Sequence, residues 1–359
     1  MLNRITVVYR PLPFARRLGA GAVVAGLTLS SGSVLLASAP ALAAPKQAAA
    51  APQELLLVSY AVTKAAYDKI IPAFVADWKK KTGQTVRIKT SFGGSGSQTR
   101  AVLDGLEADV VGLAMEADVL KIEAKGLIRP GWQKELPNNS IATNSTIAFF
   151  VRPGNPRNIR NWSDLDNKGV DVVTANPKTS GGARWSFLGL WGSQALTGSS
   201  EAQARAYIGS VLRNVDVLPK DAREATDTFV KRRKGDVLLN WETEAILARK
   251  NGEWTVPYKL PSPNVLTEMP IAVVDKNVDK HGTRRVAEAF AKFLYTPTAQ
   301  KLFVDNGFRP VTPEGKAYAR GKFQDVKFFR ISDFGGWAAF DKKFFAKGGV
   351  WDQIFKKSR

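Results

Sequence analysis

Three loops built from small residues have the composition of an anion-binding site. They are residues 93–97, 180–182 and 221–222, and each lies between the end of an expected strand and the start of an expected helix. A helix N-terminus leaves backbone N–H groups without partners and carries roughly half a positive charge. Small side chains let an oxyanion approach those groups closely. If the loops converge, they can hold an anion without a lysine or an arginine.

Each of these segments also has a purely structural interpretation. Residues 93–97 read GGSGS, which resembles a flexible linker, although they lie between a strand and a helix. Residues 180–182 are compatible with a simple tight turn. Ala222 is uninformative by itself. Trp241 ends an expected strand, where its indole either donates a hydrogen bond to a ligand or fills the core. The sequence physics alone leaves these alternatives open.

The composition excludes most catalytic chemistries. The 359 residues include no cysteine, which excludes a thiol nucleophile, a thiolate metal site, a disulfide and a lipid-modified cysteine. His281 is the only histidine, so there is no multi-histidine metal centre, and it lies in a polar stretch typical of a satisfied surface side chain. Residues 93–97 nearly match a nucleophile elbow but have serine at the fifth position. We expect a binding protein without metal or cofactor, with a secreted hydrolase using Ser95 or Ser180 as the alternative.

The first 43 residues have the pattern of a cleaved signal peptide. Four arginines and no acidic residue precede or flank the apolar stretch 18–36, and small-x-small sites follow at 37–39 and 41–43. Cleavage after Ala43 leaves 316 residues, of which 44–52 are expected to be a disordered lead-in. A membrane anchor is the alternative, but glycines and serines make the apolar stretch weakly hydrophobic. We expect an exported protein that is not a lipoprotein, with the Sec and twin-arginine routes both open.

The chain is strongly basic. It has 52 Lys and Arg residues against 32 Asp and Glu, and a formal charge of +20, which becomes +16 without the first 43 residues. Such a charge is compatible with binding to nucleic acid or an acidic polymer. The basic residues are nevertheless spread among acidic ones, and the densest run, 231–234, is typical of a solvated helix face. We therefore expect no nucleic-acid partner and a net field that attracts small anions.

Strand and helix patterns alternate along the chain from residue 55. Apolar periodicity predicts strands at 55–59, 85–90, 108–114, 145–151, 170–175, 215–218, 237–241 and 271–275. Helices are expected at 67–81, 116–125, 201–214, 220–234, 242–250, 283–295 and 297–306. Two more are expected to follow the glycine loops, one from 93–97 to about 107 and one from 180–182 to 195. Serial strand–helix units imply parallel sheets covered on both faces, and about 300 residues exceed one comfortable core. The sequence predicts two α/β lobes.

At these loops the chain resembles the periplasmic sulfate-binding proteins (sulfate/thiosulfate class) of ABC importers. Residues 176–184, NPKTSGGAR, match the signature N-P-K-[ST]-S-G-x-A-R of that family at every position. Residues 79–91 follow a second signature, K-x-x-T-G-Q-x-V then Q-S, with Thr90 in place of Gln. The likeness runs from about Glu54 to the end, including FGGW at 334–337 and GGVWDQ at 348–353.

This resemblance implies a two-lobed periplasmic binding protein fold of type II, with the ligand in the cleft between the lobes. The implied ligand contacts are Ser95, Ser180, Gly181, Gly182, Ala222 and Trp241. Ser180 would use its hydroxyl and N–H, Trp241 its indole N–H, and the glycines and Ala222 their backbone N–H groups. The lobes are expected to comprise 53–145 with 270–359 and 146–269, joined by crossing strands near 145–151 and 269–274.

The function implied by the resemblance is the capture of sulfate and its delivery to the permease subunits of an ABC importer by a monomeric protein. Thiosulfate, molybdate or phosphate is the alternative ligand. Two further positions differ from the family pattern. Asp221 stands where the family often has Gly, and Ala61 where it commonly has Asp. The acid beside Ala222 leaves open whether Asp221 faces the ligand.

Overall fold

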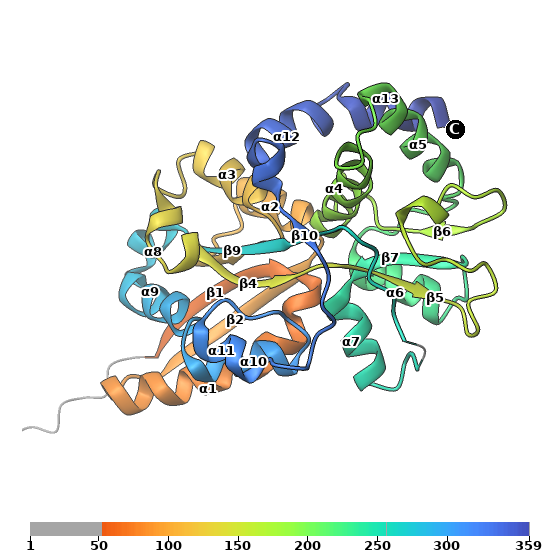
Figure 1. Ribbon diagram of the computed structural model, residues 1–359. Coiled ribbons are helices and arrows are strands. Elements are labelled where there is room, and N and C mark those ends of the chain that lie inside the picture. Colours follow the sequence, from red (N-terminus) through yellow and green to blue (C-terminus); the bar gives the residue numbers. More distant parts are fainter. Residues whose placement is uncertain (1–51, 256, 359) are drawn as a thin grey trace, which may run out of the picture. The chain divides into compact units, whose positions relative to one another are not determined.

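The computed structural model describes residues 52–255 and 257–358, and most of its strands form two sheets (Figure 1). The first sheet has the order β2-β1-β3-β9-β4, with β1 Gln53–Tyr60, β2 Val86–Gly93, β3 Val110–Gly112, β4 Ile141–Ser145 and β9 Thr267–Val273. The second has the order β5-β7-β6, with β5 Ile147–Val151, β6 Val172–Val173 and β7 Val237–Trp241. Two short strands, β8 Asn264–Val265 and β10 Phe328–Phe329, pair in parallel. The predicted signal peptide lies outside the described residues.

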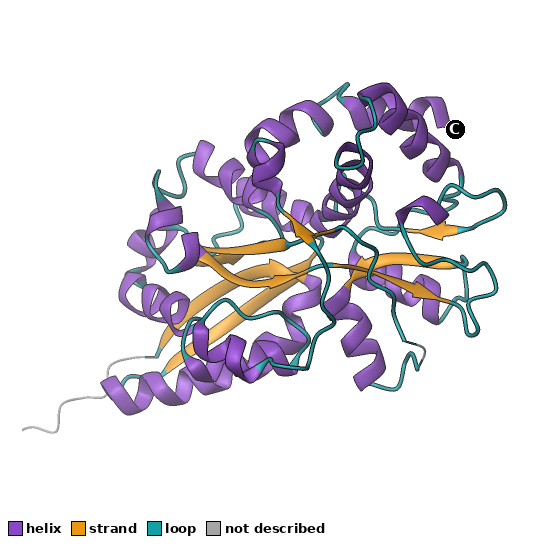
Figure 2. Ribbon diagram, viewed as in Figure 1, coloured by secondary structure: helices purple, strands orange, loops and turns teal. Residues whose placement is uncertain are grey.

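Helices lie on both sides of the strands (Figure 2). Around the first sheet they are α1 Lys64–Thr82, α2 Ser95–Leu103, α3 Glu116–Ala124, α8 Asp275–His281, α9 Arg284–Phe293, α10 Pro297–Asp305 and α11 Pro313–Tyr318. Around the second they are α4 Gly181–Ala195, α5 Glu201–Arg213, α6 Ala222–Val230 and α7 Glu242–Lys250. The chain ends with α12 Gly336–Phe344 and α13 Val350–Ser358. Within the described residues, no helix combines the length and apolarity needed to cross a membrane.

Helix α1 shows how the apolar pattern becomes packing. Its residues Ile70, Phe74 and Trp78 recur every four positions and are buried against the first sheet. The Phe74 ring meets Phe290 of α9 edge to face, with the centroids 5.2 Å apart. Gly83 ends the helix in the left-handed conformation (φ 72°) and donates its N–H to Lys79 O, as is common for a glycine that follows a helix.

The prediction of purely parallel sheets is wrong, because both sheets are mixed. Strands β1, β2 and β3 are parallel, but β9 runs antiparallel to β3 and β4, and β5 runs antiparallel to β7. The chain passes from the first sheet to the second at Thr146, between β4 and β5, and has returned to the first by the start of β9. These strands enter a sheet from the other one rather than through a strand–helix–strand unit. Their direction is therefore not fixed by the crossover rule.

Other differences concern the edges of elements. Residues 215–218, predicted as a strand, lie in no strand; the edge beside β7 belongs to β6, whose Val172 N–H donates to Asn214 O. Helix α2 ends at Leu103, four residues before the predicted end. The division into lobes at 53–145 with 270–359 and at 146–269 stays a prediction. The last helix, α13, packs against α5 of the second sheet.

His281 is partnered on both ring nitrogens. It ends α8, with Nδ1 2.9 Å from Asp109 Oδ1 and Nε2 3.0 Å from Glu107 Oε2. Asp109 is buried and also accepts from Leu56 N and Thr283 Oγ1. Hydrogen bonds to Glu107 and Asp109 raise the pKa of His281 above its ordinary value. The imidazolium thus ties the end of α8 to the segment that leads into β3.

We predict that this contact makes stability depend on pH. Since the folded pKa of His281 is raised, its contribution is fully present below the unfolded pKa of about 6.5 and is lost as pH rises through the folded value. Urea unfolding of the wild type and His281→Gln should therefore differ most near about pH 5.5 and least near about pH 9. A difference that grows with pH would contradict this assignment.

Candidate functional site

One cavity contains all six residues that the resemblance singled out. It is small and lies at the carboxyl ends of β1 and β7. The lining residues are Tyr60, Ala61, Val62, Gly93, Gly94, Ser95, Ala114, Ser180, Gly181, Gly182, Asp221, Ala222 and Trp241. The structure thus brings the three small-residue loops together, which is the condition that the sequence set for an anion site. Their part in ligand binding stays a prediction.

Three α-helices begin at this cavity. Helix α2 starts at Ser95 after the N-cap Gly94, α4 starts at Gly181 after Ser180, and α6 starts at Ala222 after Asp221. The first N–H groups of a helix have no acceptor within it, and the helix dipole places partial positive charge there. The convergence gives the cavity a donor-rich, electropositive wall even though no lysine or arginine lines it among the described residues.

The glycines at these starts allow close approach. A Cβ on Gly182 would lie 2.6 Å from Trp241 Nε1, and one on Gly181 would lie 2.7 Å from the Cβ of Ala114. A Cβ on Gly94 would lie 2.6 Å from Thr179 O. Each distance is shorter than a side chain tolerates, so the loops pack against their neighbours only as glycine. The tight-turn and flexible-linker interpretations do not explain this packing.

Trp241 presents a buried donor without an acceptor. Its side chain is 1% exposed, and Nε1 has no hydrogen-bond partner among the described residues. The indole ring lies beside Tyr60, with centroids 5.9 Å apart, and the Tyr60 hydroxyl is also buried without a partner there. Leaving such a group unsatisfied costs about 1–3 kcal/mol. Buried polar groups in proteins normally have a partner, so the Trp241 indole N–H is a donor at the cavity that the described residues leave unused.

The two serines have different hydroxyl environments. Ser95 Oγ donates to Asp118 Oδ2 at 2.6 Å and accepts from Ala114 N at 3.0 Å. Ser180 Oγ accepts from Ala183 N at 3.4 Å, and its proton has no acceptor among the described residues. We infer that Ser95 offers its backbone N–H whereas Ser180 also offers its hydroxyl.

Asp221 uses its carboxylate to cap α6. Oδ1 accepts from Glu224 N at 2.9 Å. The neighbouring Arg223 contacts Glu253 at 2.6 Å and Glu244 at 3.4 Å, two residues that do not line the cavity. Burial raises the pKa of Glu244 to about 7, and Thr226 Oγ1 donates to it at 2.6 Å. The acid at position 221 therefore has a structural role as the N-cap of α6.

Elements of the two sheets contact each other around the cavity. Gly96 N donates to Thr179 O at 3.1 Å, and Trp185 Nε1 of α4 donates to Ala114 O at 2.7 Å. Arg184 Nη1 lies 2.6 Å from Asp341 and 3.8 Å from Asp118, both carboxylates. These contacts hold the helix starts of both sheets at one place.

The sequence did not predict Tyr60, Ala61 or Val62 as ligand contacts, although it marked Ala61 as a departure from the family pattern and all three line the cavity. Ala61 begins a short 3-10 helix, η1 Ala61–Thr63, directly after β1 and ahead of α1. The sequence pattern that could have identified these residues is a strand end followed by a helix start, as in the other loops. It was less visible because the segment carries no glycine.

Enzymatic features do not come together at this cavity. Neither serine hydroxyl contacts a histidine, since both ring nitrogens of His281 bind Asp109 and Glu107. Among the described residues, no group of three or more acidic or histidine side chains is placed to hold a metal ion. The structure thus gives no support to the secreted-hydrolase alternative.

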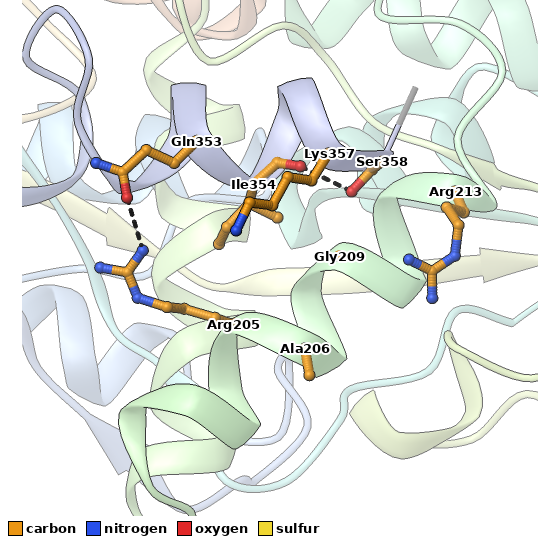
Figure 3. A pocket seen from close by; sticks show the side chains of 8 residues that line it. All are labelled: Arg205, Ala206, Gly209, Arg213, Gln353, Ile354, Lys357 and Ser358. Atoms are coloured by element: carbon orange, nitrogen blue, oxygen red, sulfur yellow. Dashed lines mark hydrogen bonds between the residues drawn. The ribbon is translucent and has the colours of Figure 1, made fainter.

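A second pocket lies between α5 and α13, with Arg205, Arg213 and Lys357 around it (Figure 3). Arg205 is already engaged, because it contacts Glu201 at 2.7 Å and donates to Gln353 Oε1 at 3.0 Å. Lys357 and Arg213 are exposed surface side chains. None of the residues predicted from the loops lines this pocket.

We predict that Gly182→Ala destabilises the protein without ligand. The new Cβ would lie 2.6 Å from Trp241 Nε1, which forces a shift of a buried ring and costs about 1–3 kcal/mol. The melting temperature should fall measurably. Gly209→Ala in α5 is the matched control, because its Cβ meets nothing nearer than 3.5 Å and should be neutral or stabilising. Equal melting temperatures for Gly182→Ala and the wild type would show that the close packing is not required.

The comparisons with known proteins agree with the geometry. The profile of the family described as bacterial extracellular solute-binding protein matches residues 55–309. A sulfate-binding protein of Synechococcus elongatus is 55% identical over 305 residues, which cover 84% of this chain and 87% of the relative. A thiosulfate-binding protein of Pseudomonas aeruginosa is 40% identical over 306 residues, which cover 84% of this chain and 92% of that protein.

A solved structure gives the same result for the fold. The sulfate-binding protein SubI from Mycobacterium tuberculosis superposes with a TM-score of 0.75 at 34% identity, covering 82% of this chain and all of SubI. The predicted two-lobed periplasmic binding protein fold is therefore confirmed. The named relatives are binding proteins rather than enzymes. The chain belongs to the bacterial extracellular solute-binding proteins, within the sulfate- and thiosulfate-binding group that its two signatures predicted.

Proposed function

We propose that this protein binds sulfate in the cavity between the two sheets and delivers it to the permease of an ABC importer. The observation that carries the proposal is the Trp241 indole N–H, buried without an acceptor beside three helix N-termini. A dianion would accept from this donor and from the backbone N–H groups together. The ligand contacts proposed are Ser95, Ser180, Gly181, Gly182, Ala222 and Trp241.

The same arrangement of donors favours closure of the two lobes around the ligand. Ser95 starts a helix at the first sheet, whereas Ser180 and Trp241 belong to the second. A ligand that contacts all three favours the conformation in which the lobes meet, because only that conformation offers all the donors at once. The closed form would then dock on the permease. We propose that the protein acts as a monomer without a cofactor.

The proposed location is the periplasm, after cleavage of the signal peptide behind Ala43. The relatives' class, extracellular solute-binding proteins, supports export. N-terminal sequencing of the exported protein tests this: a mature chain beginning at Ala44 is expected, and an uncleaved Met1 in the membrane fraction would favour an anchor.

Thiosulfate is the second candidate ligand, because thiosulfate-binding relatives reach 40% identity over most of the chain. Calorimetric titration of the full mature protein with sulfate, thiosulfate, molybdate and phosphate distinguishes the ligands. Sulfate should also raise the melting temperature, since a ligand that binds only the folded state stabilises it. No heat and no thermal shift with any of the four anions would refute the proposed class of ligand.

We predict that Trp241→Phe weakens sulfate binding by roughly 10- to 150-fold, because a hydrogen bond to a charged group contributes about 1.5–3 kcal/mol. Phenylalanine keeps much of the ring and removes the donor. Trp254→Phe is the matched control. Trp254 is half-buried, its Nε1 is likewise buried without a partner among the described residues, and it does not line the cavity. Its dissociation constant should be unchanged. If both variants bind like the wild type, Trp241 is a core residue.

We also predict that the affinity for sulfate exceeds the affinity for phosphate by at least ~100-fold. Every proposed contact is a donor, and a buried polar group without a partner costs about 1–3 kcal/mol or more. Near neutral pH, phosphate keeps a proton that needs an acceptor, whereas sulfate has none. Asp221 is the one acid in the lining, and its Oδ1 is used by Glu224 N. Asp221→Asn should therefore leave the preference in place. Equal affinities for the two anions in a competition titration would contradict the donor-only site.

A further inference from the structure

The position of Trp241 depends on its backbone, because its indole nitrogen has no partner among the described residues to fix it. Tyr60 and the closely packed Gly182 lie against the indole ring and limit its movement. The main chain at Trp241 ends β7, pairs with Ile147 of β5, and is the N-cap of α7. What fixes the first residue of α7 therefore also fixes the direction of the indole N–H.

That first residue is Glu242, which is 0% exposed. Its carboxylate is held from two sides. Arg309 Nε donates to Oε2 at 2.6 Å and Nη2 donates to Oε1 at 2.9 Å, while Tyr258 Oη donates to Oε1 at 3.0 Å. A two-pronged guanidinium–carboxylate contact fixes orientation as well as distance. A buried carboxylate that loses its partner is strongly unfavourable, so Glu242 has little freedom to move away.

Arg309 is itself fixed at the crossing between the sheets. Its backbone pairs with Asn144 of β4 through two hydrogen bonds of 2.8 Å, and its guanidinium donates to Gln324 O at 2.8 Å. The guanidinium also lies 5.0 and 5.2 Å from the ring centroids of Phe323 and Phe328. The side chain of Arg309 thus reaches from a segment paired with β4 of the first sheet to the start of α7 beside the second sheet.

A second contact supports the same junction. Thr243 Oγ1 lies 2.9 Å from Ser145 Oγ of β4 and donates to Gly307 O at 3.0 Å. Both groups belong to the segments that carry Asn144 and Arg309. Helix α7 is therefore attached at its start to the strand through which the chain crosses between the sheets. Neither Glu242 nor Arg309 lines the cavity.

We propose that the Arg309–Glu242 ion pair is a positioning device for Trp241, which orients the indole N–H toward the ligand from the side of the crossing strands. The inference rests on the proposed function, because it assumes that Trp241 donates to the anion. The two residues act through Trp241 and do not contact the ligand. Their effect on affinity should therefore disappear when the indole donor is removed.

A double-mutant cycle tests this inference. Sulfate dissociation constants are measured by calorimetry for the wild type, Arg309→Lys, Trp241→Phe and the double variant. Lysine keeps the charge and loses the two-pronged contact. We expect Arg309→Lys to weaken binding by roughly 5- to 30-fold when Trp241 is present, and by no more than about 2-fold in the Trp241→Phe background. Equal weakening in the two backgrounds, or none in either, would overturn the inference.

Arg284→Lys is the control for a purely structural role. Unlike Arg309, which holds one carboxylate, Arg284 joins two, at 2.9 Å from Asp275 and 2.6 Å from Asp279. It lies at the start of α9 and does not line the cavity. This variant should lower the melting temperature and leave the dissociation constant unchanged. If Arg309→Lys behaves in the same way, the ion pair serves stability alone and the inference is wrong.

A milder change keeps the test possible if Arg309→Lys does not fold. Tyr258→Phe removes one hydrogen bond to Glu242 and leaves the ion pair. It should weaken sulfate binding by a few-fold in the wild-type background only. The outcomes also separate the two proposals. If Trp241→Phe alone binds sulfate normally, the proposed site fails. If Trp241→Phe weakens binding but neither Arg309→Lys nor Tyr258→Phe does, only the positioning role fails.

Discussion

Many hydrogen-bond donors lie together in one buried cavity, and the packing around the cavity depends on this cluster of donors. Three helices start at the cavity, and the adjacent Trp241 indole N–H has no acceptor among the described residues. Such groups are unfavourable in a protein interior unless a ligand accepts from them. The wall includes no lysine or arginine within the described residues, so its positive potential comes from dipoles that the fold itself orients.

Holding these donors in place requires tight packing around them. Gly182 has no room for a side chain against the Trp241 ring, and Gly181 has none against Ala114. The Ser95 hydroxyl donates to Asp118 and accepts from Ala114 N, which fixes the loop at the start of α2. Ser95 and Asp221 thus use their side chains to hold the backbone at two of the helix starts.

The arginines nearest the cavity are used in ion pairs and do not form part of its wall. Arg184 and Arg309 each hold a carboxylate close to the cavity without lining it. A cation in the wall would attract sulfate, phosphate and carboxylates alike, whereas fixed donors favour an anion that needs no acceptor. The net positive charge of the chain can still increase the local concentration of anions.

The sequence by itself determined the local features of this protein. The small-residue loops, the helix starts at Gly181 and Ala222 and the left-handed Gly83 follow from neighbours in the chain, and the two signatures placed the chain in its family. Only the tertiary structure decided the antiparallel course of β9, the capping role of Asp221, the pairing of Ser95 with Asp118 and the contact of Arg309 with Glu242. Most of these features join residues far apart in the chain, and even the local cap depends on which rotamer of Asp221 the packed loop allows. Periodicity and propensity act over a few residues, whereas such contacts depend on which surfaces the packed core brings together.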